Sequence, residues 1–444
     1  MNLTVTSSPN QDTAPTRAEA RPESFSLDPA TTLISRTVLR SDASLHPTTT
    51  IIGTAPSREE AVPIDAVADA VWLRAGPPAA DRNGQTLRVA DLFSGCGAMS
   101  LGIRESCRAL RIPFEIAGAF DIDPHAIGIY ARNFGLRGRA AEPCDLGRIL
   151  SKQTHRKKLT QNEQVLRRRV GRVDLVVAGP PCQGNSDLNN RTRRVDPRNE
   201  LYYCVARFAR LFTPRWILIE NVTSVTHDHG DVVARTKQAL RKQGYEVVDG
   251  IVNLAHIGVP QTRKRHLLVA VLKRGRKRVP KALEALDKMM GRYNVLSRSV
   301  SWAIGDLRSL PWPKEARDTA AVPSLITMSR IDWLFRTDSY DLPDSKRPPC
   351  HRDKAHSYHA VYGRLRPDIP APTITGGFQT MGRGRFVNPW ERRTLTAHEA
   401  ARLQFIPDWF DFCITKVPKS RLAEIIGNAV PPRLSYVLAL ELLR

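Results

Sequence analysis

The pattern of hydrophobic and polar positions divides the chain near residue 85. Residues 1–78 are rich in Ser, Thr, Pro and Ala with scattered charge and few aromatic side chains, so we expect most of them to be disordered, apart from a short helix at 64–73. Beyond residue 85, short apolar runs alternate with amphipathic stretches. The pattern predicts strands at 87–92, 115–120, 173–178, 216–219 and 266–272, and helices at 98–110, 201–211 and 434–442. Such alternation predicts an α/β fold.

One predicted strand leads directly to a cysteine. The apolar run 173–178 is ended by Gly179, Pro180 and Pro181, and Cys182 follows on the loop. In open α/β sheets, ligand sites lie beyond the carboxyl ends of the strands, and two prolines stiffen the loop at that point. A lone cysteine after a turn is more often a small buried side chain. The motifs elsewhere in the chain favour a reactive role.

A glycine-rich turn, S-G-C-G at 94–97, separates the strand at 87–92 from the following helix. This arrangement is typical of nucleotide sites, because glycines let the backbone approach a ligand at the helix N-terminus. Asp121 ends the second strand, at the distance expected for a residue that binds ribose hydroxyls. Asp145 follows another short apolar stretch. Capping of a helix or turn is the alternative role for both acids.

Charge and cysteine content narrow the choice of partners. The chain carries 67 Lys and Arg against 44 Asp and Glu, a net charge of +23, which favours a polyanionic partner. Basic clusters at 155–172, 191–198 and 264–278 are candidate phosphate contacts, although a solvated face is the alternative for each. Seven irregularly spaced cysteines suit reduced thiols in the cytoplasm. We expect no membrane span, and the cysteine and histidines within 350–359 match no zinc spacing, so we predict no metal.

Several short motifs follow one another in a specific order. They are D-L-F-S-G-C-G (91–97), G-P-P-C-Q-G-N-S (179–186), E-N-V (220–222), Q-T-R-K-R (261–265), R-T-L-T-A-H-E-A-A-R-L-Q (393–404) and G-N-A-V-P-P (427–432). Each alone is weak, but the ordered set resembles the DNA cytosine-5 methyltransferases and spans roughly residues 89–432. Two positions depart from the family pattern: Ala98 replaces a frequent glycine, and Asn185 replaces an aromatic residue in the P-C-Q loop.

The resemblance implies a fold and a domain plan. It implies a Rossmann-like S-adenosylmethionine-dependent methyltransferase domain with a smaller target-recognition domain. The expected limits are an N-terminal extension (1–82), a catalytic domain (83–274), a target-recognition domain (275–412) and a C-terminal segment that returns to the catalytic domain (413–444). Residues 275–390 mix prolines and arginines with isolated aromatics, which suits nucleic-acid contact, an ordinary small domain being the alternative.

The resemblance also implies residues that bind S-adenosylmethionine. Phe93 would stack near the adenine, Gly95 and Gly97 would face the methionine end, and Asp121 would hold the ribose. Asp145 would bind the adenine amino group. Further residues would line and close the cofactor pocket. These are Ile122, Leu146, Pro180, Leu201 and Asn428.

By the same resemblance, Cys182 is the nucleophile. Its thiolate would add to C6 of a flipped cytosine and make C5 able to accept a methyl group. Glu220 would polarise N3 of the ring, with Asn221 orienting it. Arg263 and Arg265 are two apart on an extended segment, so we expect them to point the same way and hold the base carbonyl and nearby phosphates. The alternative for Glu220 is a strand-end carboxylate in a salt bridge.

The expected function is therefore methyl transfer to C5 of cytosine in a specific double-stranded DNA sequence. Two alternatives stay open: an RNA (tRNA) cytosine-5 methyltransferase and a catalytically silent DNA-binding regulator. We expect a cytoplasmic monomer associated with the nucleoid through DNA, with cognate restriction or defence-system proteins as further partners. Thr396 and Glu399 form the pattern of a capping box, which predicts a structural role for both.

Overall fold

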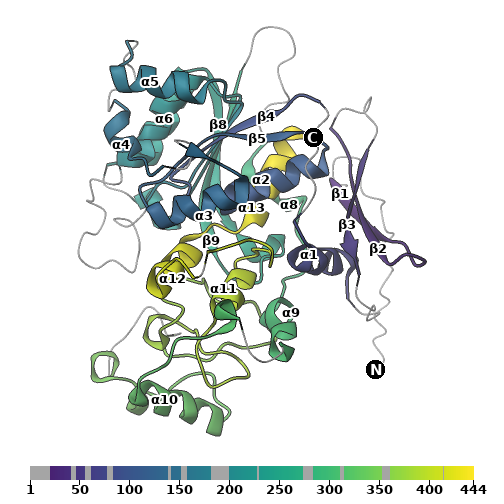
Figure 1. The fold of residues 1–444 in the computed structure, drawn as a ribbon, viewed down its shortest axis with the longest axis vertical. Coiled ribbons are helices and arrows are strands. Elements are labelled where there is room, and N and C mark those ends of the chain that lie inside the picture. Colours follow the sequence, from purple (N-terminus) through teal and green to yellow (C-terminus); the bar gives the residue numbers. More distant parts are fainter. Residues whose placement is uncertain are drawn as a thin grey trace, which may run out of the picture.

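A computed structural model describes residues 21–41, 47–55, 62–77, 84–138, 142–151, 158–181, 200–227, 230–273, 284–310, 315–352, 361–413 and 415–444. Its centre is a six-stranded sheet with the strand order β5-β4-β6-β7-β9-β8 (Figure 1). The strands are β4 (Leu87–Leu92), β5 (Phe114–Phe120), β6 (Leu175–Ala178), β7 (Trp216–Asn221), β8 (Tyr245–Asn253) and β9 (Lys264–Leu272). The first four are parallel, and β9 is antiparallel to both of its neighbours. The predicted α/β fold and its strands are confirmed.

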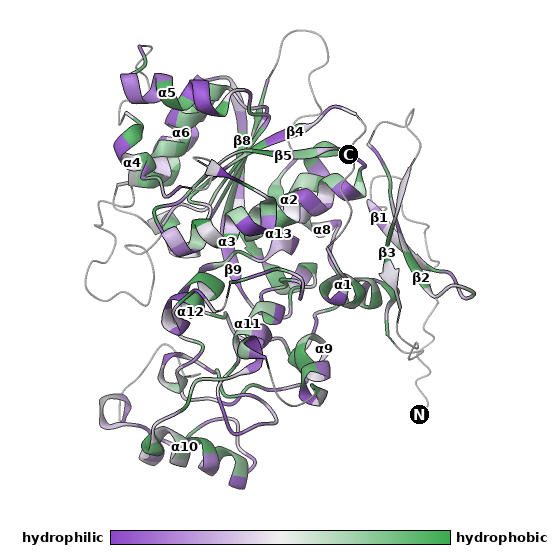
Figure 2. Ribbon diagram, viewed as in Figure 1, coloured by the Kyte–Doolittle hydropathy of each residue, from purple (hydrophilic) through white to green (hydrophobic). Residues whose placement is uncertain are grey.

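Helices cover both faces of this sheet. They are α2 (Ala98–Ala109), α3 (Pro124–Phe134), α4 (Leu146–Ile149), α5 (Gln161–Val170), α6 (Glu200–Phe212), α7 (Val232–Lys242) and α13 (Pro432–Leu443). Strand β6 is apolar at every position because Val177 packs with α2 and α13 while Val176 packs with α5, α6 and α7. The outer surface of α5 is largely hydrophilic (Figure 2). Within the described residues, none of the helices is long and apolar enough to cross a membrane.

Helix α2 and the C-terminal helix α13 pack unusually closely. A Cβ atom placed on Gly102 of α2 would lie 1.9 Å from the carbonyl oxygen of Pro432, so only glycine fits there. The hydroxyl of Ser435 donates a 2.7 Å hydrogen bond to the carbonyl of Met99 across the same contact. The expectation that the last helix packs back on the first domain is confirmed.

The described N-terminal residues are ordered, which corrects the prediction of disorder for them. An antiparallel sheet of β1 (Glu23–Leu27), β2 (Leu33–Val38) and β3 (Thr48–Thr54) is followed by α1 (Ile64–Arg74). The predicted helix at 64–73 is confirmed. This N-terminal unit, residues 21–77, has only a small core of its own, but Val38 and Leu73 join the core of the main sheet. Composition could not reveal it, because the apolar surface that it covers belongs to distant parts of the sequence.

The described residues within 284–412, which we call the recognition region after the role predicted for them, are built from short helices and irregular chain. The helices are α8 (Leu286–Gly291), α9 (Val300–Ile304), α10 (Leu325–Arg336) and α11 (Ala397–Leu403), and α12 (Lys419–Asn428) follows them. Single turns of 3-10 helix occur at Thr223–His227, Leu254–Ile257, Gly305–Ser309, Ala316–Asp318, Asp344–Lys346, Pro349–His351 and Met381–Arg383. Helix α10 has a small separate core and lies at the end of the molecule away from the sheet (Figure 1).

The capping box at the start of α11 is present. The hydroxyl of Thr396 accepts a hydrogen bond from the amide of Glu399, and the Glu399 carboxylate accepts one from the amide of Thr396. The same carboxylate pairs with Arg393 at 2.7 Å. The predicted structural role of Thr396 and Glu399 is confirmed.

Candidate active site

The carboxyl ends of three parallel strands meet in register. Leu92 of β4 pairs with Ala178 of β6, and Ala178 pairs with Ile219 of β7. The next residue of each strand therefore stands at the same edge of the sheet. A Cβ atom on Gly179 would lie 3.8 Å from the carbonyl oxygen of Phe93 and 4.0 Å from Oε2 of Glu220. The glycine turn, the start of the cysteine loop and the candidate acid are thus immediate neighbours.

The turn after β4 has the backbone that the sequence predicts. Phe93, Gly95 and Gly97 have φ values of 57°, 52° and 91°, in the left-handed region. A Cβ on Gly97 would also lie 2.7 Å from the ring of Tyr130, so this position has no room for a side chain. Phe93 is not glycine and is strained there, which is common at ligand sites. Gly97 is the residue before α2, whose N-terminus points into the site.

Asp121 is held against this turn. Its Oδ2 accepts a 2.8 Å hydrogen bond from the amide of Gly95, and its Oδ1 accepts one of 2.9 Å from the amide of Asp123. Burial raises the pKa of Asp121, and the two backbone hydrogen bonds only partly offset that effect. Ile122 beside it is 70% exposed, an uncommon position for isoleucine that offers an apolar surface to a ligand.

Asp145 caps helix α4, which was the alternative to a cofactor role. Its Oδ1 accepts a 2.9 Å hydrogen bond from the amide of Gly147, and Oδ2 lies 3.2 Å from Nε of Arg148. Leu146 is buried. A Cβ on Gly147 would lie 2.8 Å from Cδ2 of Leu201, so these two chain segments pack directly together. The predicted contact of Asp145 with adenine stays a prediction.

Asn428, the last residue of α12, is exposed. The segment before it is fixed by close packing, because a Cβ on Gly427 would lie 2.1 Å from the amide nitrogen of Gly376. The side chain of Gln404 donates hydrogen bonds to the carbonyls of Ile426 (2.8 Å) and Gly427 (3.2 Å). Asn428 is therefore carried on a rigid support.

Glu220 and Arg265 form a buried ion pair on adjacent strands. Nε of Arg265 lies 2.7 Å from Oε1 of Glu220, and only 12% and 9% of the two side chains are exposed. The N–H direction does not fit a hydrogen bond, so within the described residues Oε1 has the charge of Arg265 nearby but no hydrogen-bond donor. This is the salt bridge that was the alternative role of Glu220, and it leaves Oε1 buried without a hydrogen-bond donor among the described residues.

Asn221 connects this pair to the cysteine loop. Its Nδ2 donates a 3.3 Å hydrogen bond to the carbonyl of Pro180, which is buried, and its Oδ1 accepts one of 2.8 Å from the amide of Val222. The side chain of Asn221 is buried. It therefore holds the strand end that carries Glu220 against the beginning of the loop.

Arg263 differs from the prediction. Its guanidinium is buried and Nη1 donates hydrogen bonds to the carbonyls of Ile374 (3.0 Å) and Gly427 (3.1 Å). Strand β9 begins only at Lys264, so the strand alternation does not extend to Arg263. Arg265 pairs with Glu220, whereas Arg263 holds together two distant chain segments. The expectation that both arginines point the same way is wrong.

The comparisons with known proteins agree with this geometry. The model of the C-5 cytosine-specific DNA methylase family matches residues 87–444. The chain is 38% identical to the Type II methyltransferase M1.BsuMI of Bacillus subtilis (strain 168), with 95% of each chain covered. The chain belongs to the C-5 cytosine-specific DNA methylases.

More distant relatives of this DNA methylase cover less of the chain. The Type II methyltransferase M1.HphI of Haemophilus parahaemolyticus is 28% identical over 81% of this chain and 87% of its own. The structure of the S. pombe Dnmt2 methyltransferase has a TM-score of 0.53 at 21% identity, covering 80% of this chain and 98% of that one, which supports the same fold. The predicted family, fold class and enzyme class are confirmed.

The nucleophile assigned by the motif lies outside the described residues. Description ends at Pro181 and resumes at Glu200, so Cys182, Asn185 and the arginines at 191–198 are not placed. The described residues on either side, Gly179 to Pro181 and the start of α6, frame the site. In this DNA methylase the roles of the individual site residues remain predictions.

Sequence reasoning missed one polar residue of the site. Asp91 in β4 is fully buried; its Oδ2 accepts a 2.6 Å hydrogen bond from Ser100, whose hydroxyl accepts one of 2.7 Å from Tyr130. Burial raises the pKa of Asp91 well above its usual value. These hydrogen bonds connect β4, α2 and α3 next to the glycine turn. The signal was an acidic residue between the apolar residues Ala90 and Leu92 near the end of a strand.

Proposed function

We propose that this methylase transfers a methyl group from S-adenosylmethionine to C5 of cytosine in double-stranded DNA through a covalent adduct with Cys182. The observation that supports this most directly is the Glu220–Arg265 pair at 2.7 Å, beside the Gly179–Pro181 segment that leads into the cysteine. A buried acid beside an arginine, with an oxygen that accepts no hydrogen bond from the described residues, fits recognition of a heterocyclic base at the start of a nucleophile loop.

Cys182 acts on the ring carbon next to the one that is methylated. Its Sγ, as thiolate, forms a bond to C6, and the electron pair of the C5–C6 double bond becomes available at C5. After methylation the proton on C5 is lost to solvent, the double bond re-forms and the C6–Sγ bond breaks. An ordinary thiol is only a few per cent ionised at neutral pH, so nearby positive charge raises the reactive fraction.

Glu220 binds the ring nitrogen opposite the point of attack. Its carboxyl group shares or donates a proton at N3, which withdraws electrons from C6 and assists the addition of the thiolate. Arg265 fixes the orientation of this carboxyl, and Asn221 keeps the strand end and the loop at a constant separation. Arg263 acts at a distance, by supporting the segments around Ile374 and Gly427.

The residues at the ends of β4 and β5 fit S-adenosylmethionine. The cofactor, when bound, supplies a methyl group activated on a sulfonium. The left-handed turn at 93–97 gives the backbone close access, and the exposed Ile122 beside Asp121 offers an apolar surface next to a polar group. The exposed Asn428, on its rigid support, can close the same region from the C-terminal side.

DNA fits the charge of the molecule and the named relatives. A cytosine inside a duplex is inaccessible, so the base must be flipped out, and phosphate contacts by a strongly basic surface compensate for part of that cost. The relatives described as Type II methyltransferases suggest that this enzyme protects DNA as part of a restriction-modification or related defence system.

Trapping with 5-fluorocytosine tests the mechanism. Fluorine replaces the proton on C5 and cannot leave as a cation, so the cysteine is not eliminated after methylation and the wild-type enzyme should form a lasting adduct with fluorinated duplex DNA when S-adenosylmethionine is present. Cys182→Ala should form none and should lose methyl transfer while it still binds the cofactor. Cys413→Ala, which removes a partly buried thiol elsewhere, should behave as wild type.

Transfer to tRNA rather than duplex DNA would favour the RNA alternative, and absence of any adduct would favour a silent DNA-binding regulator. Residual turnover by Cys182→Ala would overturn the assignment of the nucleophile. Bisulfite sequencing of DNA from cells that express the chain would report the methylated sequence.

A further inference from the structure

The N-terminal unit, residues 21–77, lies outside the segment that matches the family model. The match to the Bacillus subtilis enzyme covers 95% of the chain and therefore leaves only about 22 residues unmatched, too few to omit this unit. The unit has few buried apolar side chains of its own and packs against two other parts of the molecule. Its contacts indicate what it does for the enzyme.

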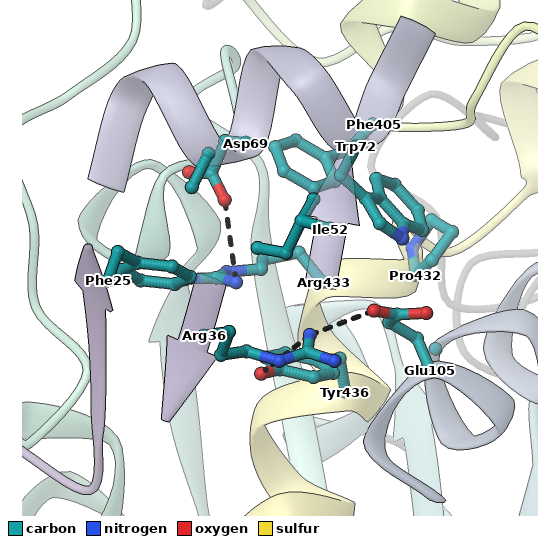
Figure 3. Close-up of a pocket in the computed structure, with 12 residues that line it drawn as sticks. Phe25, Arg36, Ile52, Asp69, Trp72, Glu105, Phe405, Pro432, Arg433 and Tyr436 are labelled. Carbon is teal, nitrogen blue, oxygen red and sulfur yellow. Dashed lines mark hydrogen bonds and ion pairs between the residues drawn. The ribbon is translucent and has the colours of Figure 1, made fainter. Parts of the chain in front are cut away.

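The first contact is a buried ion cluster with the catalytic region, by which we mean the central sheet and the helices that cover it, including α13. Nη1 of Arg36 in β2 lies 2.8 Å from Oε1 of Glu105 in α2, and both side chains are nearly inaccessible. Glu23 of β1 pairs with Arg433 of α13 at 3.1 Å and accepts a hydrogen bond from the hydroxyl of Tyr436. All of these side chains except Glu23 line one cavity of about 20 Å³, room for a single water molecule (Figure 3). Breaking such buried pairs is costly, so this contact is an anchor.

The second contact is a column of three aromatic rings with the recognition region. Trp72 of α1 stacks on Phe405, with ring centroids 5.5 Å apart and planes 19° apart, and Phe405 stacks on Trp302 of α9 at 6.3 Å and 16°. Figure 3 shows Trp72 and Phe405 beside the ion cluster. The amide of Asp408 adds a 2.9 Å hydrogen bond to the carbonyl of Leu73. Helix α1 thus holds the segment 405–408 of the recognition region, and Phe405 extends the contact to α9.

One carboxylate in α1 touches both regions. Asp69 is buried, with Oδ1 3.5 Å from Nη1 of Arg433 in the catalytic region and Oδ2 3.3 Å from Nη2 of Arg298 in the recognition region. Asp65, one turn earlier, lies 3.1 Å from Arg298. Helix α1 therefore spans the junction between the sheet that carries the active site and the region expected to read DNA.

The aromatic column ends one residue from the network that supports the active site. Phe405 follows Gln404, which donates to the carbonyls of Ile426 and Gly427. Gln261 lies two residues before Arg263. Its side chain in turn donates a 2.7 Å hydrogen bond to Oε1 of Gln404. These hydrogen bonds hold Gln404 independently of the aromatic rings, so loss of the ring stack leaves the support of Asn428 and Arg265 in place.

We propose that the N-terminal unit is a positioning element that sets the recognition region against the catalytic sheet for DNA binding, with Trp72 as its principal positioning residue. The inference rests on the proposed DNA methyltransferase activity. Among the described residues, no hydrogen bond, ion pair or ring contact joins the unit to a candidate cofactor residue, so we expect its contribution to concern DNA and not S-adenosylmethionine. The positioning role explains why the N-terminal unit makes specific side-chain contacts with both the catalytic region and the recognition region.

Steady-state kinetics of the full chain separate positioning from simple stabilisation. Trp72→Leu keeps apolar volume but removes the ring stack, and aromatic pairs are worth up to about a factor of ten in an equilibrium constant. We expect the KM for duplex DNA to rise about tenfold, whereas kcat and the KM for S-adenosylmethionine change less than about twofold. Trp72→Phe, which retains a ring, should restore most of the DNA affinity.

Phe212→Leu is the matched control. Phe212 stacks on Phe208 within the catalytic region at 4.3 Å, so this variant loses a comparable ring stack away from the recognition region. It should lower thermal stability but leave the KM for DNA unchanged. If Trp72→Leu does not fold, Trp302→Leu tests the opposite end of the column with the same expected result.

An unchanged KM for DNA in these folded variants, or an equal loss in all kinetic constants, would overturn the positioning role. Absence of methyl transfer by the wild type would instead overturn the proposed function.

Discussion

At the scale of single residues, the site combines a constrained backbone with one incompletely satisfied carboxylate. Glu220 is buried beside Arg265, yet Oε1 accepts no hydrogen bond from the described residues. A buried acceptor without a donor is costly unless a ligand supplies one, and a protonated or partly protonated cytosine N3 would do so. Arg265 fixes the position of this oxygen as its ion-pair partner at 2.7 Å.

His398 gives a prediction about pH. Its two ring nitrogens lie 2.7 Å from Oδ1 of Asp318 and 2.8 Å from Oδ1 of Asp408, and Arg402 also pairs with Asp408. Burial alone would lower the pKa of His398, but the hydrogen bonds to the two carboxylates outweigh it and raise the pKa above 6.5. A raised pKa in the folded state means that charged His398 stabilises the protein fully below about pH 6.5 and that this contribution disappears as the pH rises through the folded pKa.

We therefore expect His398→Gln to lower the free energy of unfolding more at pH 6 than at pH 9. Denaturant unfolding of wild type and variant at the two pH values measures the difference. The comparison between the two proteins cancels the titration of groups that they share. An equal loss at both pH values would show that the imidazole is not charged in the folded protein.

At the scale of secondary-structure elements, the contact of α2 with α13 depends on one glycine. Since a Cβ on Gly102 would lie 1.9 Å from the Pro432 carbonyl, Gly102→Ala must force the two helices apart. Overpacking of this kind costs about 1–3 kcal/mol and occasionally more, and here the obstacle is backbone, which cannot rotate away. We expect a loss of at least about 3 kcal/mol in the free energy of unfolding.

The matched control is Gly128→Ala in α3, where nothing lies within 4 Å of the new Cβ. Because alanine favours helix over glycine, that variant should gain about 1 kcal/mol. Thermal and denaturant unfolding of both variants measure the two effects. Similar stabilities for the two alanine variants would contradict the close packing of α2 and α13.

Five of the six strands of the central sheet were predictable because each carries a local signal, whereas β8 was not predicted. The apolar run at 87–92 and the amphipathic run at 201–211 contain their own signals, and the structure places β4 and α6 there. The motifs also led to Glu220 and Asn221 at the end of β7. The order of the strands was not predictable, since it depends on which surfaces meet after folding.

The predictions that were wrong concern residues whose structure depends on partners far away in the sequence. Arg263 turned out to bind the carbonyls of Ile374 and Gly427, more than a hundred residues away. The strands β1 to β3 have the composition of disordered chain because their apolar residues are few. These residues are buried only because α1, α2 and α13 cover them. Neither local propensity nor composition contains information about such partners.

At the scale of the whole molecule, charge should dominate the affinity for DNA. A few arginine side chains are internal. Among them, Arg207, Arg402 and Arg433 are buried and paired with acidic side chains. The net charge of +23 already counts every acid, so a large excess of basic side chains has no acidic counterpart in the chain. We expect that excess to have the phosphates of DNA as its counterpart.

Binding to duplex DNA should therefore depend steeply on salt. Contact with about 6–10 phosphates predicts a fall in affinity of about three orders of magnitude or more between 50 and 200 mM salt, because bound counterions are released from the DNA. Fluorescence anisotropy with a labelled duplex measures the slope, and the binding of S-adenosylmethionine across the same salt series serves as the control that should change little. Since the steep term is independent of sequence, a duplex without cytosine should show nearly the same slope at lower affinity. A flat response for both duplexes would mean that the basic excess faces something other than the DNA backbone.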